Sequence, residues 1–334
     1  MQETVKIKKP YVYNGSFSIK KFIYPIVIFS FIGIFAILYQ KNINSNPNVM
    51  TKINPTPIEI IFYQPLLKDK MDWDKTFQQL KQVHIKKLVL QWSKFGVVDF
   101  LKKEQWLKTI LSIAQKHQIK VIVGLYGDNK YFKTLEDRKT DIPKYLKNLK
   151  AQNIVQARKI YTIAKNYDSF DGYYIYDEID DTNFKEKERQ VYLKAYLETL
   201  ALSLNNISKH PLYLSGYFSN HMKPLEYANM FSEITQHKYT VLLQSGIGAN
   251  LVNNQRSALY IQTFSNNFKG SFIPIIEGFK MEGNKIKSID FNSLYQQIEL
   301  IRSTIENKPM AIFSLRYFLD TVVFKKYLSH YKKL

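Results

Sequence analysis

The chain has 334 residues, of which 45% are hydrophobic and 15% aromatic, which is enough apolar side-chain mass for one sizeable core. It has no cysteine, which excludes a disulfide framework, thiol catalysis and thiolate metal sites. The net charge is +20, yet only six of the 48 basic residues are Arg and the Lys residues are spread along the chain, so we expect a solvated basic surface and no nucleic-acid partner.

An uncharged apolar run at residues 22–39 is about 18 residues long, close to the length that crosses a bilayer as a helix. Five Lys residues precede it, and only Lys41 and Lys52 follow in the next segment, so the positive-inside rule predicts a cytoplasmic N-terminus. A cleaved signal peptide is the competing interpretation, but no convincing small-residue cleavage site follows the run. We therefore expect a single-pass protein of the bacterial inner membrane, with the rest of the chain periplasmic or extracellular. The expected divisions are a cytoplasmic tail, a transmembrane anchor, a polar linker and a barrel domain, at residues 1–21, 22–39, 40–57 and 58–334.

After the linker, short apolar runs alternate with longer segments of helical period, which is typical of repeated βα units around a parallel sheet. The expected strands are Glu59–Tyr63, Lys87–Gln91, Lys120–Leu125, Gly172–Tyr176, Leu212–Gly216, Thr240–Gln244, Phe272–Ile276 and Met310–Ser314. The expected helices are Trp73–Val83, Gln105–His117, Leu146–Tyr167, Glu186–Asn205, Pro224–Thr235, Asn254–Phe268, Phe291–Glu306 and Val322–Tyr331. This pattern predicts an α/β fold, a single (β/α)8 barrel. No Gly-rich phosphate motif follows the first strand, so a dinucleotide-binding fold has no support.

Polar and aromatic side chains follow the expected strands, at the end where barrels of this type carry their active sites. Aromatic faces stack on sugar rings while amides and carboxylates bind hydroxyl groups, so this composition favours a carbohydrate. The His residues show no metal-ligand spacing, and we expect neither a metal nor a cofactor. The residues expected to line sugar subsites are Tyr63, Gln64, Trp92, Tyr126, Tyr176, Gln244 and Tyr317.

Two glutamates have the strongest case for chemistry. Glu178 follows the fourth expected strand and Glu277 the seventh, positions that face each other across the mouth of an eight-stranded barrel. A retaining glycosidase needs one protonated and one ionised carboxyl group, separated by about 5 to 5.5 Å. The plainer alternative is that Glu178 belongs to an acidic loop, residues 177–181, that caps the next helix, and that Glu277 is a solvated loop charge.

The segments FYQP, LVLQWSKFG, VIVGLYGD, FDGYYIYDEIDD, PLYLSGYFSN, VLLQSGIGAN, PIIEGF and IFSLRYF, between Ile58 and Asp320, resemble the successive strand motifs of an uncharacterised bacterial barrel family. That family is related to the clan of glycoside hydrolases with catalytic glutamates on strands four and seven. The resemblance implies that Glu178 is the acid/base and Glu277 the nucleophile. The chain departs from this pattern at two positions. Asp177 stands where the clan has Asn, which removes an expected amide contact to the sugar 2-hydroxyl, but Asp177 is kept among the expected substrate-binding residues. Ser245 stands where the family has the Asp of a Gln-Asp-Gly turn, which removes a substrate-binding or helper carboxylate.

Two functional hypotheses follow from these residues. The first is a membrane-anchored glycoside hydrolase that acts on an extracytoplasmic polysaccharide or oligosaccharide by a retaining mechanism. The second is a non-catalytic glycan-binding barrel that holds polymer at the membrane or contacts a polysaccharide synthesis or export complex. A lysine-rich nucleic-acid binder is a third class, and it lacks both an Arg cluster and a recognition motif.

Overall fold

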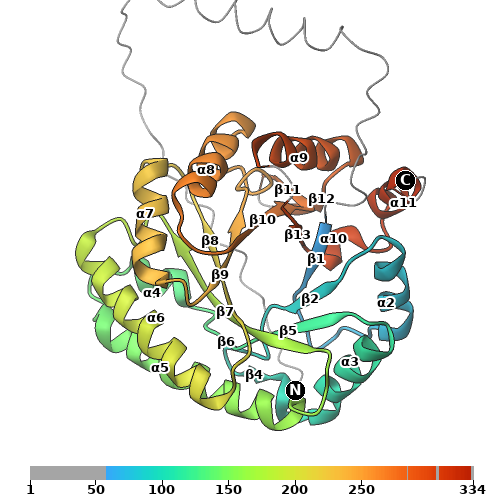
Figure 1. Cartoon of the computed structure of the whole chain (residues 1–334), viewed down its shortest axis with the longest axis horizontal. Coiled ribbons are helices and arrows are strands. Elements are labelled where there is room, and N and C mark those ends of the chain that lie inside the picture. The colour runs from blue at the N-terminus through green and yellow to red at the C-terminus, as the bar shows by residue number, and fades with distance from the viewer. Residues whose placement is uncertain (1–57, 284, 306–307, 332–334) are drawn as a thin grey trace, which may run out of the picture. The chain divides into compact units, whose positions relative to one another are not determined.

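The computed structural model describes residues 58–283, 285–305 and 308–331. Eight parallel strands close into a barrel in the order β1-β13-β10-β9-β8-β7-β5-β2 (Figure 1). They are β1 Ile58–Tyr63, β2 Lys87–Leu90, β5 Lys120–Gly124, β7 Phe170–Asp180, β8 Leu212–Tyr217, β9 Thr240–Gln244, β10 Phe272–Glu277 and β13 Met310–Phe313. All eight expected strands are present, so the expected (β/α)8 barrel is confirmed.

Helices surround the barrel and cover the outer faces of its strands (Figure 1). They are α2 Trp73–Gln82, α3 Glu104–Lys116, α5 Ile142–Ala164, α6 Lys187–Ile207, α7 Pro224–Thr235, α8 Asn254–Asn267, α9 Phe291–Thr304 and α11 Val322–Tyr331. The largest difference from expectation is α5, which begins four residues before the expected Leu146. Its start is set by Asp141, whose side chain accepts from the Lys144 backbone N–H, and by Pro143 in the first turn.

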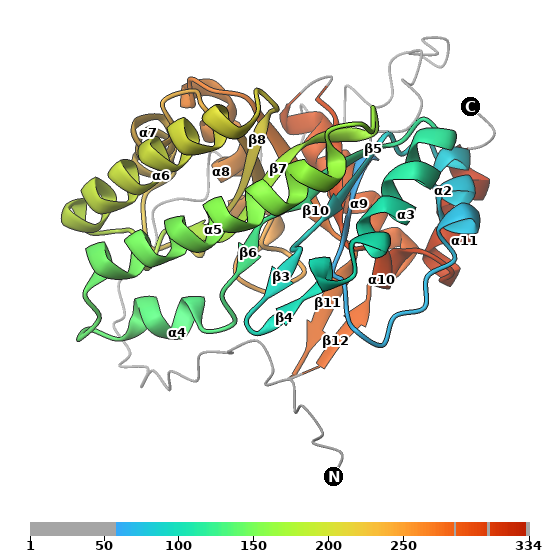
Figure 2. The same cartoon turned by 90° about the horizontal axis from the view of Figure 1, so that it is seen from below.

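Shorter elements lie in the segments between a strand and the helix that follows it, and the sequence did not predict them. They are β3 Lys94–Phe95, β4 Val98–Asp99, η1 Phe100–Lys102, β6 Tyr126–Gly127, α4 Tyr131–Glu136, β11 Phe279–Glu282, β12 Lys285–Ser288 and α10 Leu315–Phe318. Figure 2 shows β3, β4, α4 and the β11–β12 hairpin projecting from the same end of the barrel. They therefore add walls at the carboxyl ends of the barrel strands.

Alternation along the strands divides the core into two layers. On β1, Ile60 and Phe62 face the barrel interior, whereas Ile61 and Tyr63 pack outward against the helices. Inside, the ring of Phe62 meets the edge of Tyr174 with a centroid separation of 5.6 Å. Buried interior residues are Ile60, Phe62, Val89, Ile122, Tyr174, Tyr213, Leu242, Ile275 and Ala311. The interior is thus a packed core, and a ligand has access only at its ends.

A polar cluster lies near the amino-terminal end of the barrel. Lys87 Nζ of β2 is 2.7 Å from Asp171 Oδ2 of β7 and 3.3 Å from the Tyr213 hydroxyl of β8. The Tyr213 hydroxyl also donates to Asp171 Oδ2 at 3.2 Å. These contacts tie three strands together at the end opposite the candidate site.

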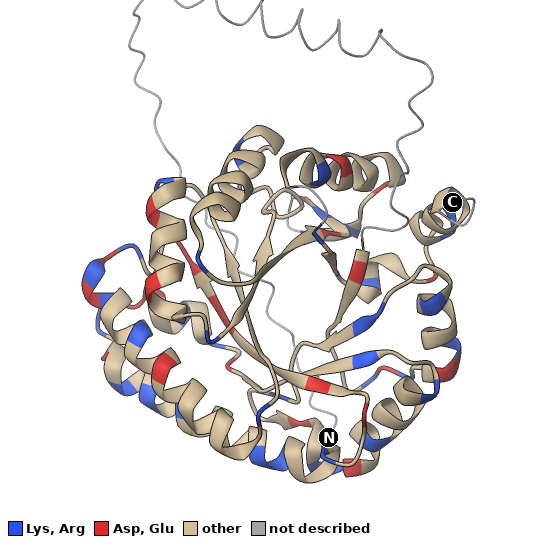
Figure 3. Cartoon of the chain, in the orientation of Figure 1, with Lys and Arg blue, Asp and Glu red and all other residues tan. Residues whose placement is uncertain are grey.

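The expected cytoplasmic tail, anchor and linker, at residues 1–57, lie outside the described residues. Within the described part of the chain, no helix is both long and apolar enough to cross a membrane. Figure 3 shows Lys and Arg on helices all around the ring, as their spread along the sequence suggested.

Candidate active site

A bulge in β7 places Glu178. Ile175 pairs with Leu214 of β8, but the next pair joins Ile179 to Gly216, so four steps along β7 match only two along β8. The intervening residues, 176–178, are the bulge. Strand bulges commonly redirect a side chain at a functional site.

Glu178 is half-buried and bonded to β9, which lies beyond β8 in the barrel: the Gln244 amide donates to Glu178 Oε1 at 3.1 Å. Burial raises the pKa of Glu178 to about 7, against the lowering effect of the Gln244 hydrogen bond. The negative charges of Asp180 and Glu277 raise it further. Near neutral pH this carboxyl group is therefore able to hold or release a proton.

Glu277 ends β10 with only 1% of its surface exposed. Its Oε2 accepts from the Gly248 backbone N–H at 2.5 Å and from the Ser245 hydroxyl at 3.3 Å. Burial raises the pKa of Glu277 to about 7, while these donors and the backbone N–H groups of Gly246 and Ala249 oppose the shift. The segment 245–249, between β9 and α8, thus wraps the carboxylate with donors that favour its ionised form.

Gly248 is required for this wrapping. A Cβ at this position would lie 2.2 Å from the Phe279 carbonyl oxygen and 2.8 Å from the Glu277 Cβ, so no larger residue fits without movement. The Gly248 carbonyl in turn accepts from the Met281 backbone N–H of β11 at 2.9 Å. The segment after β9 is therefore held between Glu277 and the β11–β12 hairpin.

Consecutive residues of one strand end connect the two glutamates. Gln244 binds Glu178, and Ser245 binds Glu277. Gln297 of α9 fixes the Glu277 backbone from outside: its Oε1 accepts from the Glu277 N–H at 3.1 Å, and its Nε2 donates to the Glu277 carbonyl at 3.2 Å. One strand end thus holds two carboxyl groups with raised pKa values, an arrangement that suits paired acid/base and nucleophilic chemistry.

Aromatic side chains surround the mouth on two sides. Trp92 stacks on Phe95 with a centroid separation of 4.4 Å, and the edge of Tyr176 meets Trp92 at 5.6 Å. On the other side, Phe279 lies 5.7 Å from Tyr317.

Tyr126 and Gln64 lie on the same rim. Tyr126 is half-buried, and Lys94 Nζ lies 5.1 Å from the centroid of its ring. Gln64 is half-buried, and its backbone carbonyl accepts a hydrogen bond from the Arg316 guanidinium at 2.9 Å. The expected residues Gln64, Trp92, Tyr126, Tyr176, Gln244 and Tyr317 therefore all belong to this end of the barrel.

Tyr63 and Asp177 do not face the mouth, contrary to expectation. Each lies at an alternate position of its strand whose side chain points outward, toward the helices. Tyr63 is 3% exposed, packs edge-on against Trp73 and donates to Asp69 Oδ2 at 2.8 Å. Asp177 is 2% exposed and accepts hydrogen bonds from residues of α5 and α6. Neither side chain is placed to contact a sugar in the mouth.

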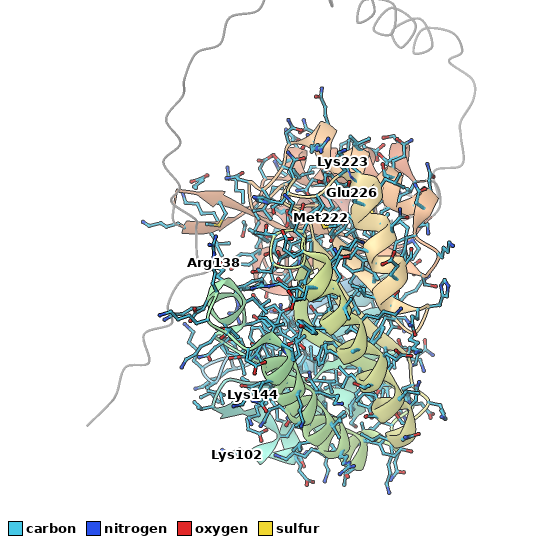
Figure 4. All side chains as sticks on the ribbon, turned by 90° about the vertical axis from the view of Figure 1, so that its left-hand side faces the viewer. Lys102, Arg138, Lys144, Met222, Lys223 and Glu226 are labelled. Atoms are coloured by element: carbon cyan, nitrogen blue, oxygen red, sulfur yellow. The ribbon has the colours of Figure 1, made fainter. Side chains whose placement is uncertain are left out.

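Two further polar residues, Asp181 and Gln297, support the site, and neither was expected from the sequence to do so. The buried carboxylate of Asp181 accepts from the backbone N–H groups of Ser219, His221 and Met222 at 2.8, 2.7 and 3.2 Å, which fixes the segment after β8. Figure 4 shows Met222 beside Lys223 and Glu226 at the start of α7, where this segment ends. The second is Gln297, whose only sequence signal is an amide on the apolar face of a helix. No group of three or more His, Cys, Asp or Glu in the described ranges is arranged to hold a metal ion.

Comparison with known proteins agrees with this architecture. The model of the family described as "Domain of unknown function (DUF4434)" matches residues 61–321, so the chain belongs to that family. The Uncharacterized protein YbcH of Escherichia coli (strain K12) is 29% identical over 210 residues, which cover 60% of this chain and 69% of YbcH.

Two solved glycoside hydrolase structures share the fold. A putative alpha-L-fucosidase from Bacteroides thetaiotaomicron has a TM-score of 0.64 and 16% identity, covering 84% of this chain and 96% of that one. A GH113 beta-1,4-mannanase has a TM-score of 0.55 and 8% identity, covering 84% of this chain and 99% of that one. The chain therefore belongs to a family of unknown function, and its barrel has the same fold as these two structures.

Proposed function

We propose that this member of the DUF4434 family is a glycoside hydrolase that cleaves a polysaccharide or oligosaccharide with retention of configuration, using Glu178 and Glu277. The observation that carries the proposal is the presence of two carboxyl groups, each with its pKa raised to about 7, near the carboxyl ends of β7 and β10. Both are bonded to the end of β9, which lies between them in the barrel order.

The hydrogen-bond donors around each carboxyl group decide the roles. Backbone N–H groups and a hydroxyl surround Glu277 and stabilise its ionised form, as a nucleophile requires. In the described part of the chain, Glu178 has only the Gln244 amide as a side-chain donor, and the nearby charge of Glu277 favours its protonated form. When one proton is present on the pair, Glu178 is therefore expected to hold it.

The reaction then has two steps. Glu277 attacks the anomeric carbon and forms a glycosyl ester, while the bond to the leaving oxygen breaks and Glu178 gives that oxygen its proton. A water molecule next attacks the anomeric carbon, Glu178 takes its proton, and the ester bond to Glu277 breaks. The half-buried rings of Tyr126, Tyr176 and Tyr317 supply stacking surfaces for the sugars on either side of the cleaved bond. Trp92 is only 5% exposed and supports Tyr176 from behind.

The proposed location of this activity rests on the sequence. Residues 22–39 would anchor the chain in the bacterial inner membrane, and the barrel would act on glycan outside the cytoplasm. A polysaccharide synthesis or export complex is the corresponding candidate partner.

One observation favours the alternative of a non-catalytic glycan-binding barrel. Glu277 is 1% exposed, and the segment 245–249 covers it. In a binding protein Glu277 would only fix this segment, and glycan would contact the aromatic rim without being cleaved.

Glu277→Gln and Glu178→Gln distinguish the two functions, measured on a panel of 4-nitrophenyl glycosides and on polysaccharides. The proposal predicts that Glu277→Gln abolishes turnover of every substrate. Glu178→Gln is expected to lower turnover of polysaccharide by about 10²- to 10⁴-fold and to spare 4-nitrophenyl glycosides most, because their leaving group needs no proton.

Glu282→Gln, on the exposed β11–β12 hairpin, is the matched control and should behave as wild type. Equal turnover by wild type and both site variants would refute the catalytic assignment. Binding of glycan without turnover by all of them would support the binding barrel.

A further inference from the structure

We infer that Asp177 is a positioning residue, whose buried bonds to α5 and α6 fix the β7 bulge and thereby direct the Glu178 side chain into the mouth. The inference rests on the proposed function, because that function makes the position of Glu178 important. It concerns a residue that was expected from the sequence to be among those that bind substrate.

The contacts of Asp177 lie entirely behind the barrel wall. The Tyr196 hydroxyl of α6 donates to Asp177 Oδ2, and Asn153 Nδ2 of α5 lies 3.3 Å from the same oxygen. Asn153 Nδ2 also donates to the Tyr196 hydroxyl at 3.0 Å, so the three side chains form a closed cluster. Asn153 is 0% exposed and Tyr196 is 4% exposed.

The bulge needs such an anchor because the strand ladder does not hold it. The pairs of β7 with β8 pass from Ile175 directly to Ile179, and its pairs with β5 end at Tyr174. Residues 176–178 therefore lack ladder partners among the residues that the structure describes. Asp177 is the middle residue of this segment, so its side chain bonds replace the missing backbone pairs.

The same cluster reaches a second feature of the mouth. Asn153 Oδ1 accepts from the backbone N–H of Tyr126, the first residue of β6, at 3.0 Å. One buried cluster thus connects the backbone of an aromatic rim residue with the residue before Glu178. Loss of the Asp177 side chain is expected to disturb both.

One oxygen of Asp177 argues that the role depends on shape and not on charge. Asp177 Oδ1 is buried and has no hydrogen-bond partner among the described residues. An unpartnered oxygen does not help to stabilise a buried carboxylate. The Asn side chain has the same shape, so it can keep an oxygen at the bonded Oδ2 position and place its NH2 group at the Oδ1 position. Asp177→Asn should therefore preserve the position of Glu178, and Asp177→Ala should not.

The test is a ¹³C NMR titration of the Glu178 carboxyl group in the full chain labelled at glutamate, with the signal identified by its absence in Glu178→Gln. In Asp177→Ala we expect the pKa of Glu178 to fall by at least about one unit, because the carboxyl group leaves its buried position beside Gln244. Asp177→Asn should restore the wild-type value. Asp171→Ala, at the other end of the same strand, is the matched control and should leave it unchanged.

Tyr196→Phe, which removes one hydroxyl group, provides a milder disruption if Asp177→Ala does not fold, and a smaller shift in the same direction is expected. An unchanged Glu178 titration in folded Asp177→Ala or in Tyr196→Phe would overturn the inference. So would Asp177→Asn behaving like Asp177→Ala, since charge and not shape would then matter.

Turnover supplies a separate measurement. For any glycan that the wild type cleaves, Asp177→Ala should lower kcat by about tenfold or more with KM nearly unchanged, and Asp177→Asn should recover it. Absence of turnover in the wild type would count against the proposed function only, because the titration tests the position of Glu178 independently.

Discussion

At the scale of single residues, the site has two carboxyl groups in the mouth, Glu178 and Glu277, and a third behind it, Asp177. Burial raises the pKa values of Asp177, Glu178 and Glu277 to about 7 each. A carboxyl group that is harder to ionise in the folded chain than in the unfolded one lowers stability once the pH exceeds its unfolded pKa. The site is therefore expected to be maintained at a cost to stability, as is common where function requires buried charge.

Asp177→Asn should show this cost directly. The unfolded carboxyl group titrates near 3.8 and the folded one near 7, so the folded chain binds more protons between these values and wild-type stability falls as the pH rises through this range. The amide does not titrate, so Asp177→Asn should exceed wild type in the free energy of unfolding at about pH 8, by on the order of 1 to 4 kcal/mol, and match it at about pH 3.5.

Urea denaturation at the two pH values measures the difference. Asp171→Asn, which weakens the ion pair with Lys87, should instead be less stable than wild type at about pH 8. A pH-independent effect of Asp177→Asn would contradict the assigned cause.

At the scale of elements, the segment between β9 and α8 carries the site as much as the strands do. It is held by Glu277 on one side and by β11 on the other. The segment contains no helix or strand, but it keeps one conformation because its buried hydrogen-bond donors have defined acceptors.

Gly248→Ala tests this arrangement. The added methyl group would meet the Phe279 carbonyl oxygen, which is backbone, so the segment must move and the bond from the Gly248 N–H to Glu277 is expected to lengthen or break. We expect a loss of about 1 to 3 kcal/mol in the free energy of unfolding, measured by urea denaturation.

Gly283→Asn in the β11–β12 turn is the control. A Cβ there meets nothing within 4 Å, and Asn tolerates its positive φ of 59°. Similar stability losses in both variants would argue against a special fit at Gly248.

At the scale of the whole molecule, the barrel closes within its own strands. β1, which begins at Ile58, pairs with β13 and β2. Closure of this kind leaves the barrel sheet without a free edge in the described residues.

A chain that starts at Asn54 should therefore keep the thermal unfolding midpoint of the full chain within about 2 °C, and it should move from the membrane fraction to the supernatant of a cell lysate. Circular dichroism and fractionation measure the two outcomes. Aggregation of the shortened chain, with a well-behaved full chain in detergent, would show that the boundary is wrong. Recovery of the full chain in the supernatant would refute the anchor.

The sequence alone determined the repeating βα order, all eight barrel strands and the positions of Glu178 and Glu277 at strand ends, because these depend on local periodicity and on the fixed polarity of the fold. It did not determine which way Tyr63 and Asp177 face. The alternation of side chains along β1 points Tyr63 away from the mouth. The bulge in β7 could be recognised only from the pairing of β7 with β8. The wrapping of Glu277 by residues 245–249 and the cluster of Asn153, Asp177 and Tyr196 likewise depend on segments far apart in the chain, which only the closed barrel and its helices bring together.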